Sequence, residues 1–221
     1  MSDDELGLDS MFPEPPRPPT PDPTFSIYKR EKATGSVEDW SELIIRLVGT
    51  HPLWGHHLWN SARSIATYLD NHPDLYTNGS VLELGAGGGL PAIVAANNGA
   101  EKFNVDKNVL PSRRHHVSVQ GFIWGTSVQP LLSSLSNTNG FNLIILSDLI
   151  FNHSQHDALL NTCEQATPSV LVFYTHHRPH LGRGWHCQEI LTQKFEPMFP
   201  DDPGEEEIRA TVHGWKLNRP S

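Results

Sequence analysis

A glycine-rich turn between residues 81 and 90 is the stretch of this sequence best suited to holding a ligand. It reads Val-Leu-Glu-Leu-Gly-Ala-Gly-Gly-Gly-Leu, with glycines at positions 85, 87 and 89 directly after an apolar segment. Glycines placed after a strand let the backbone turn tightly and approach a ligand without Cβ collisions. The turn therefore predicts a ligand site at the end of a strand; the alternative is a turn without a ligand.

The acid Glu83 bears on which cofactor this turn would hold. A dinucleotide motif would place its third glycine at position 90, which is leucine, and would set a pyrophosphate on a helix N-terminus. The negative charge of Glu83, two residues before the first glycine, would repel a pyrophosphate. The same charge suits a cofactor that carries a sulfonium and an amine, so the pattern favours S-adenosylmethionine over NAD.

A second polar site is expected where the apolar run Phe141–Ile150 is interrupted by Ser147 and Asp148. Such a run is typical of a strand that is buried on both faces of a parallel sheet. Open α/β sheets bind ligands at the carboxyl ends of their strands. Asp148 is therefore a candidate catalytic residue.

The elements that must position these residues alternate along the chain, which predicts an α/β fold with a mostly parallel sheet. Apolar periodicity and turn residues predict helices over His56–Leu69, Pro91–Asn98, His156–Ala166 and Gln188–Phe195. Strands are expected over Ser80–Leu84, Val117–Trp124, Phe141–Ile150, Ser169–Tyr174 and Thr211–Leu217. The segment Trp40–Val48 fits either a short helix or a strand.

Composition limits the other classes of protein that this chain could represent. Residues 1–24 hold seven of the 18 prolines and six acids against one arginine, which predicts a disordered tail before a domain over 25–221. The net charge is −9, and the sequence contains no basic stripe of the kind that binds nucleic acids. We therefore expect no nucleic-acid partner. Two cysteines without a CxxC pair, no signal peptide and no apolar run of 18 residues predict a cytoplasmic protein without a membrane span.

Three motifs together resemble the seven-β-strand S-adenosylmethionine-dependent protein methyltransferases. They are the Glu-Leu-Gly-Ala-Gly turn, the upstream Leu-Trp-Gly-His-His-Leu-Trp-Asn and the later Ile-Leu-Ser-Asp-Leu-Ile-Phe-Asn-His. Within that family, the sequence is most similar to the fungal enzymes that methylate elongation factor 1-alpha at its N-terminus. The resemblance implies a Rossmann-like seven-stranded sheet with helices on both faces. It also implies methylation of an N-terminal glycine α-amine and of the adjacent lysine.

The resemblance also implies which residues contact the cofactor: Trp59, Gly85, Ala86, Gly87, Trp124 and Ser147. The two tryptophans could offer aromatic faces to an adenine ring or a sulfonium, although either alone also fits core packing. A monomer is expected. The alternatives are a small-amine methyltransferase of the nicotinamide type and a non-catalytic binding protein on the same scaffold.

The chain departs from the family pattern after Phe103, where part of the second strand–helix unit is expected to be missing. Spacing from Gly85 would select Asp106 as the acid that holds the cofactor ribose. Only ten residues separate Asp106 from Val117, too few for a helical crossover. A second, shorter gap is expected after Leu181.

The 13 histidines do not form a metal motif. No metal site is therefore expected. His153 could line a substrate channel or could simply begin a helix.

Overall fold

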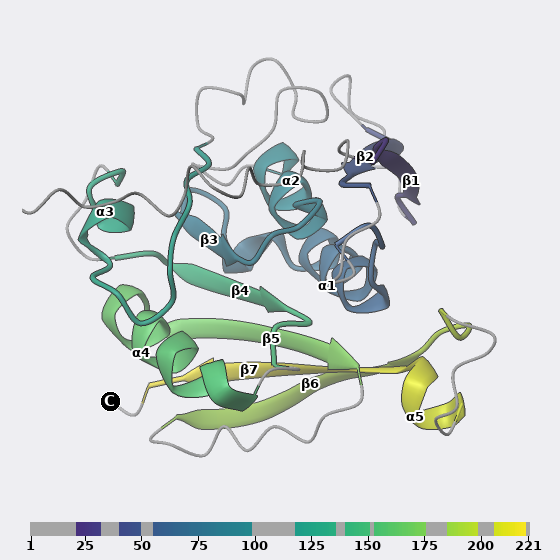
Figure 1. The fold of residues 1–221 in the computed structure, drawn as a ribbon. Helices are drawn as coiled ribbons and strands as arrows, with labels where there is room; N and C mark the ends of the chain where they lie inside the picture. Colours follow the sequence, from purple (N-terminus) through teal and green to yellow (C-terminus); the bar gives the residue numbers. More distant parts are fainter. Residues whose placement is uncertain are drawn as a thin grey trace, which may run out of the picture.

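A five-stranded sheet forms the centre of the computed structural model, which describes residues 21–31, 40–49, 55–98, 118–135, 140–150, 153–175, 185–198 and 206–219. The strand order is β3-β4-β5-β7-β6, seen from top to bottom in Figure 1. The strands are β3 (Val81–Leu84), β4 (Leu143–Ser147), β5 (Ser169–Thr175), β6 (His186–Lys194) and β7 (Thr211–Asn218). The pairs β3–β4 and β4–β5 are parallel, and β7 is antiparallel to both of its neighbours. Four strands therefore share one direction, which confirms the mostly parallel α/β sheet.

Helices cover both faces of this sheet. The helices α1 (Asn60–Asn71) and α2 (Leu90–Asn97) share a buried core with Ile145, Leu171 and Phe173, here called the α1-side core. The helices α3 (Gln129–Leu132) and α4 (His156–Ala166) pack on the other face with Ile144 and Val172, the α4-side core. Strand residues alternate between the two cores because successive side chains of a strand point to opposite faces. The shorter elements are η2 (Pro73–Leu75), η4 (His153–Gln155) and α5 (Glu206–Ala210).

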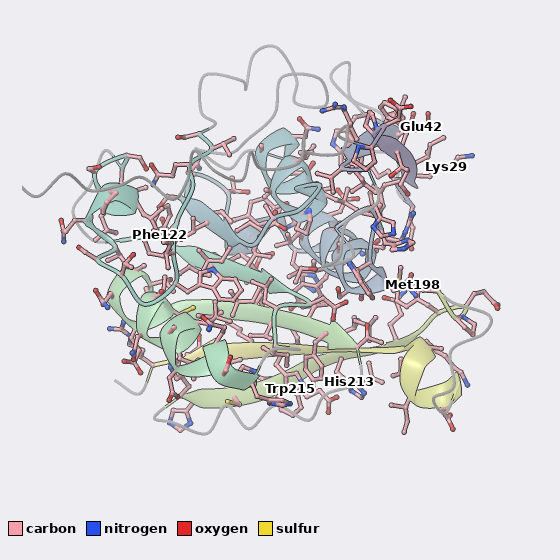
Figure 2. All side chains as sticks on the ribbon, viewed as in Figure 1. Lys29, Glu42, Phe122, Met198, His213 and Trp215 are labelled. Atoms are coloured by element: carbon pink, nitrogen blue, oxygen red, sulfur yellow. The ribbon has the colours of Figure 1, made fainter. Side chains whose placement is uncertain are left out.

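A separate antiparallel hairpin of β1 (Thr24–Lys29) and β2 (Glu42–Leu47) lies beside these helices. Lys29 and Glu42 pair at one end of the hairpin, and Figure 2 shows them next to each other. The buried residues of β2, Leu43, Ile45 and Leu47, join the α1-side core, whereas the residues between them are exposed. This alternation settles the Trp40–Val48 segment as a strand.

A buried ion pair fastens the hairpin to α1. The Arg30 guanidinium donates to both carboxylate oxygens of Asp70, at 2.7 to 3.0 Å, and lies 4.6 Å from the centre of the Trp40 ring. The Arg30 and Asp70 side chains are 7% and 5% exposed. Asn98, at the end of α2, donates to Asp70 Oδ1 at 2.8 Å, so one carboxylate joins three elements.

Two expectations about secondary structure are wrong. The segment Gln188–Phe195 is not a helix but lies almost entirely in β6, paired with β7. A register shift between Glu189 and Leu191 lets the consecutive residues Ile190 and Leu191 both pack against the α1-side core. The alternating segment Val117–Trp124 forms no strand over its described residues 118–124. Alternating apolar residues are not enough to form a strand when no described strand pairs with the segment.

The other expected elements are confirmed to within a few residues: the helices α1, α2 and α4 and the strands β3, β4, β5 and β7. Several expectations fall outside the described residues: the tail over 1–20, the gap after Phe103, Asp106 and the gap after Leu181. The tail boundary stays a prediction, and Thr24 is the first residue of β1. None of the helices in the described part of the chain is long and apolar enough to cross a membrane.

Candidate active site

The glycine turn leads from the carboxyl end of β3 into α2. Gly85, Gly87 and Gly89 all have positive φ angles, of 62°, 53° and 68°, a conformation that side chains with a Cβ rarely adopt. A Cβ at Gly85 would meet Leu149 Cδ2 at 2.5 Å, whereas a Cβ at Gly87 would meet no atom of the described residues within 4 Å. Gly85 is therefore needed for packing as well as for the turn, and Gly87 has no described neighbour in the direction of a side chain.

Glu83 takes a different role from the one its charge suggested. Its carboxylate is buried and accepts a hydrogen bond of 3.0 Å from the backbone N–H of Ala92, in the first turn of α2. Burial raises the pKa of Glu83 to about 8, and the bond from Ala92 opposes this rise only in part. The hydrogen bond of Glu83 therefore joins β3 to the first turn of α2 on either side of the glycine turn.

Four polar residues meet where α1 begins and where β4 and β5 end, and together they form the polar cluster of Ser61, Ser147, Asp148 and Thr175. The Ser61 hydroxyl donates to Asp148 Oδ2 at 2.9 Å, and its oxygen lies 3.2 Å from Ser147 Oγ. The backbone N–H of Thr175 donates to Asp148 Oδ1 at 3.1 Å. Both oxygens of the Asp148 carboxylate are therefore held by neutral donors.

Asp148 combines an unusual backbone with an unusual acidity. Its φ angle of 53° is in the left-handed region, and its own N–H donates to Phe173 O at 2.8 Å. Burial raises the pKa of Asp148 to about 6, and the bonds from Thr175 and Ser61 oppose the rise. Strained, pKa-shifted carboxylates concentrate at functional sites, and this one lies where an open α/β sheet binds ligands.

The predicted aromatic contacts lie in different places. Trp59 is the N-cap residue of α1, half-buried, with its ring edge-on to His57 at 6.3 Å. It is two residues from Ser61 and so adjoins the polar cluster. Trp124 packs with Phe122, labelled in Figure 2, against the α4-side core. The next residue, Gly125, donates its N–H to Thr162 of α4.

The structure thus brings Trp59, Gly85, Ser147 and Asp148 to one edge of the sheet, the edge where the parallel strands end. Ala86 and Gly87 continue from Gly85 along the same turn, and Ala86 O accepts the N–H of Gly89 at 2.7 Å. No described contact joins Trp124 to the polar cluster, so its predicted role as a cofactor contact is a proposal. His153 lies exposed in η4, with its ring 4.9 Å from that of His156.

Sequence reasoning missed Ser61 and Thr175. Thr175 ends the second buried strand as Ser147 ends the first, so the rule that selected Ser147 could have found it. Ser61 carries no such signal, because its contact with Asp148 spans 87 residues of sequence.

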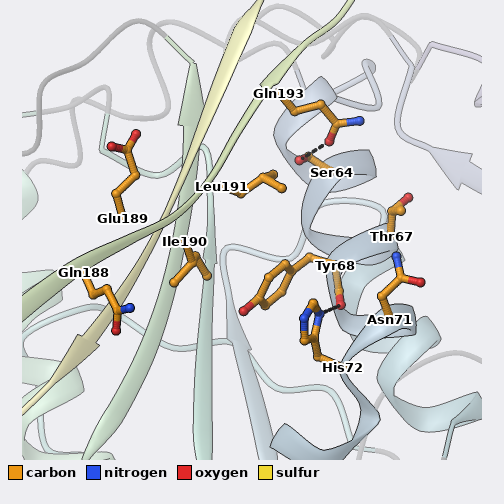
Figure 3. Close-up of a pocket in the computed structure, with 10 residues that line it drawn as sticks. All are labelled: Ser64, Thr67, Tyr68, Asn71, His72, Gln188, Glu189, Ile190, Leu191 and Gln193. Atoms are coloured by element: carbon orange, nitrogen blue, oxygen red, sulfur yellow. Dashed lines mark hydrogen bonds between the residues drawn. The ribbon is translucent and has the colours of Figure 1, made fainter.

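A pocket of about 420 Å³ lies apart from the polar cluster, between α1 and β6 (Figure 3). Tyr68 and His72 stack at its wall with ring centres 4.1 Å apart, and Ser64 donates to Gln193 across it at 2.8 Å. None of the predicted site residues lines this pocket. In the described part of the chain, no group of three or more His, Cys, Asp or Glu side chains could hold a metal ion.

Comparison with known proteins identifies the family. A model of the lysine methyltransferase family matches residues 38–181. The protein N-terminal and lysine N-methyltransferase EFM7 of Cryptococcus neoformans is 41% identical, with 98% of this chain and 90% of that protein covered. Its namesake in Schizosaccharomyces pombe is 38% identical, with 100% of this chain and 99% of that protein covered.

These relatives contain internal residues that this chain lacks. The alignment with the Cryptococcus protein extends over 268 positions, although 98% of this 221-residue chain is only about 217 residues. The difference leaves about 51 positions of the alignment without a residue of this chain. With the match over residues 38–181 and the identity along nearly the whole length, these findings show that the chain belongs to the lysine methyltransferase family.

Proposed function

We propose that this chain transfers methyl groups from S-adenosylmethionine to the N-terminal glycine α-amine, and to the adjacent lysine, of elongation factor 1-alpha. Membership of the family makes it a methyltransferase with a methyl donor and a protein acceptor. The observation that carries the choice of acceptor groups is that relatives aligned over nearly their whole length are named protein N-terminal and lysine N-methyltransferases. The choice of elongation factor 1-alpha as the substrate rests on the sequence resemblance alone. We expect it to act as a monomer in the cytoplasm.

The turn and its neighbours fit the proposed cofactor. The described residues leave room for a ligand close to the backbone at Gly87, and half-buried Trp59 offers an aromatic surface. We assign Gly85, Ala86, Gly87, Trp59 and Ser147 to this cofactor, and Trp124 by resemblance alone. The cofactor would supply a methyl group activated on a sulfonium.

The acceptor amine must be neutral when it attacks. An N-terminal amine has a pKa of about 7.7–8, against about 10.4 for lysine, so a useful fraction is neutral near pH 7.5. Asp148, with its pKa of about 6, is mostly ionised at that pH and can accept an N–H of the amine. The amine lone pair forms the new N–C bond while the S–C bond breaks, and the methylated product loses a proton to solvent. Asp148 orients the amine, and positioning supplies most of the acceleration.

Mass spectrometry of defined peptides tests this function. The purified chain and S-adenosylmethionine are incubated with a synthetic peptide that copies the N-terminus of elongation factor 1-alpha. We expect methyl groups on the α-amine and on the adjacent lysine, and none on the α-amine of an N-acetylated control. Methylation of nicotinamide but not of the peptide would instead identify a small-amine enzyme.

A non-catalytic binding protein is the second candidate, because of the positions present in relatives but missing here. Isothermal titration of S-adenosylmethionine would compare this chain with a version in which a relative's second strand and helix are inserted after Phe103. If only the extended version bound S-adenosylmethionine, the result would favour the hypothesis that this chain is a non-catalytic binding protein.

A further inference from the structure

Thr175 is the member of the polar cluster that lies at the end of β5. Alternation along β5 places it with Leu171 and Phe173, which belong to the α1-side core. It is 8% exposed, while Ser147 and Asp148 beside it are half-buried. The cluster therefore extends from a buried hydroxyl to the surface of the molecule.

The Thr175 hydroxyl is buried and, among the described residues, has no hydrogen-bond partner. Its backbone N–H, by contrast, is bonded to Asp148. A buried hydroxyl that has lost its bond to water without gaining another destabilises the folded protein, and such groups are rare in native structures. A bound ligand that supplies the missing partner would remove this cost.

Thr167, two residues before β5 begins and at the opposite edge of the sheet, is a buried threonine with a structural role. It is 4% exposed. Its hydroxyl donates to Phe141 O at 2.9 Å or Ser169 O at 3.0 Å, and its oxygen accepts the N–H of Ser169 at 3.1 Å. Of these two buried threonines, Thr167 has a hydrogen-bonded hydroxyl, whereas the hydroxyl of Thr175 has no partner among the described residues.

We propose that Thr175 is an acceptor-binding residue, whose hydroxyl oxygen accepts one N–H of the substrate amine beside the Asp148 carboxylate. This inference rests on the proposed function, because it names the acceptor of that reaction. A neutral primary amine has two N–H donors and one lone pair. Two acceptors on the protein would bind both N–H groups and leave the lone pair directed away from them, toward the methyl donor.

This arrangement predicts a dependence on how far the amine is already methylated. A monomethylated amine keeps one N–H, and a neutral dimethylated amine keeps none. The Thr175 hydroxyl should therefore assist the first methylation and have no N–H to bind in the third. A contact with the cofactor would instead affect every methylation equally.

The test compares the full-length parent with Thr175→Val, which removes the hydroxyl and keeps the shape, and with Thr167→Val as the matched control. Melting temperature, S-adenosylmethionine affinity and kcat/KM are measured, the last on a peptide with a free N-terminal glycine and on the same peptide with a dimethylated α-amine. The following lysine is replaced by arginine in both peptides, so that only the α-amine is read.

For Thr175→Val we expect an unchanged or higher melting temperature, unchanged cofactor affinity and a roughly tenfold lower kcat/KM on the free amine, equivalent to about 1.4 kcal/mol. Its kcat/KM on the dimethylated peptide should match that of the parent. Thr167→Val should lower the melting temperature and leave kcat/KM nearly unchanged.

Several outcomes would overturn the inference. A Thr175→Val enzyme with the parent's kcat/KM on the free amine, with equal losses on both peptides, or with weakened cofactor binding would contradict it while the proposed function stands. A parent that leaves the free-amine peptide unmethylated would overturn the proposed function, and the inference with it.

Discussion

Asp70 and Asp148 are two carboxylates that lie against opposite ends of α1, and their surroundings differ in kind. Asp70, in the last turn, is held by the Arg30 guanidinium and the Asn98 amide. Asp148, beside the first turn, is held only by a hydroxyl and a backbone N–H. A cation balances the first carboxylate, whereas burial with neutral partners raises the pKa of the second to about 6.

The difference separates a carboxylate whose charge is balanced by a cation of the protein from one that we assign to the proposed reaction. Asp70 joins the hairpin to α1 and α2, so its charge is compensated within the protein. No charged side chain is among the causes of the shift in the pKa of Asp148. A positively charged or N–H-bearing ligand would find an acceptor at Asp148 and none at Asp70.

The largest expected effect comes from removing the cation that balances Asp70. Arg30→Met keeps an apolar stem but leaves the Asp70 charge buried without a cation, which should lower the free energy of unfolding by about 3–5 kcal/mol. Chemical denaturation measures this loss. Lys194→Met is the control, because its partner Glu207 is 3.6 Å away and both side chains are exposed. That variant should change stability by less than about 1 kcal/mol.

Equal stability of the Arg30 and Lys194 variants would show that Asp70 is not compensated by Arg30. The activity of the Arg30 variant per folded molecule should match that of the parent, since the pair lies away from the polar cluster.

The next effect should be on catalysis. Asp148→Asn keeps the shape but removes the charge, and we expect kcat/KM for the free-amine peptide to fall roughly a hundredfold, about 2.7 kcal/mol. Stability should respond in the opposite direction. The folded pKa of about 6 exceeds the ordinary 3.8, so the folded state holds the proton more tightly. The parent should therefore lose stability as the pH rises from about 4 to 6.

Asp148→Asn should lack this loss and melt at an equal or higher temperature than the parent at pH 7.5. Thermal melts across pH 4–8 measure it. A variant that keeps full activity, or that melts well below the parent, would make Asp148 a structural residue like Asp70.

A smaller effect is expected at the turn. Gly87→Ala adds a Cβ that meets no atom of the described residues, so the structural cost expected from them is the positive φ, about 1 kcal/mol. If the cofactor approaches the backbone here, its affinity should fall roughly tenfold, about 1.4 kcal/mol. Isothermal titration and denaturation of the same variant measure both quantities.

Gly85→Ala is the informative partner, because its Cβ would meet Leu149 and should cost more stability than Gly87→Ala. Tight cofactor binding by a well-folded Gly87→Ala protein would remove this turn from the cofactor site.

The smallest expected effect refines the chemistry of Asp148. Ser61→Ala removes a donor that stabilises the carboxylate, so the pKa of Asp148 should rise above about 6. The acidic midpoint of the pH–rate profile should move upward by about one pH unit, equivalent to one hydrogen bond to a charged group.

Ser64→Ala is the matched control on the same helix. Ser64 is also buried, but its hydroxyl donates to neutral Gln193. Both variants should lose some stability, and only Ser61→Ala should move the midpoint. An identical shift in both would mean that Asp148 is insensitive to Ser61.

Sequence reasoning determined the parts of this protein that are encoded locally. Glycines at alternate positions after an apolar run marked the turn, and the polar break after an apolar run marked Ser147 and Asp148. Burial on both faces of a parallel strand leaves such a run in the sequence, so β4 and β5 could be predicted without a structure. The resemblance to methyltransferases rested on the same local motifs, and comparison with relatives confirmed the family.

Tertiary structure decided what depends on partners distant in sequence. The segment Gln188–Phe195 became a strand because β7 supplies its hydrogen bonds, and Val117–Trp124 did not because no described strand pairs with it. Glu83 turned toward the N–H of Ala92, which only the packing of β3 against α2 reveals. Ser61 and Thr175 reach Asp148 across 87 and 27 residues of sequence. Local patterns carry no record of such contacts, because chain folding and not spacing brings their donors to the acceptor.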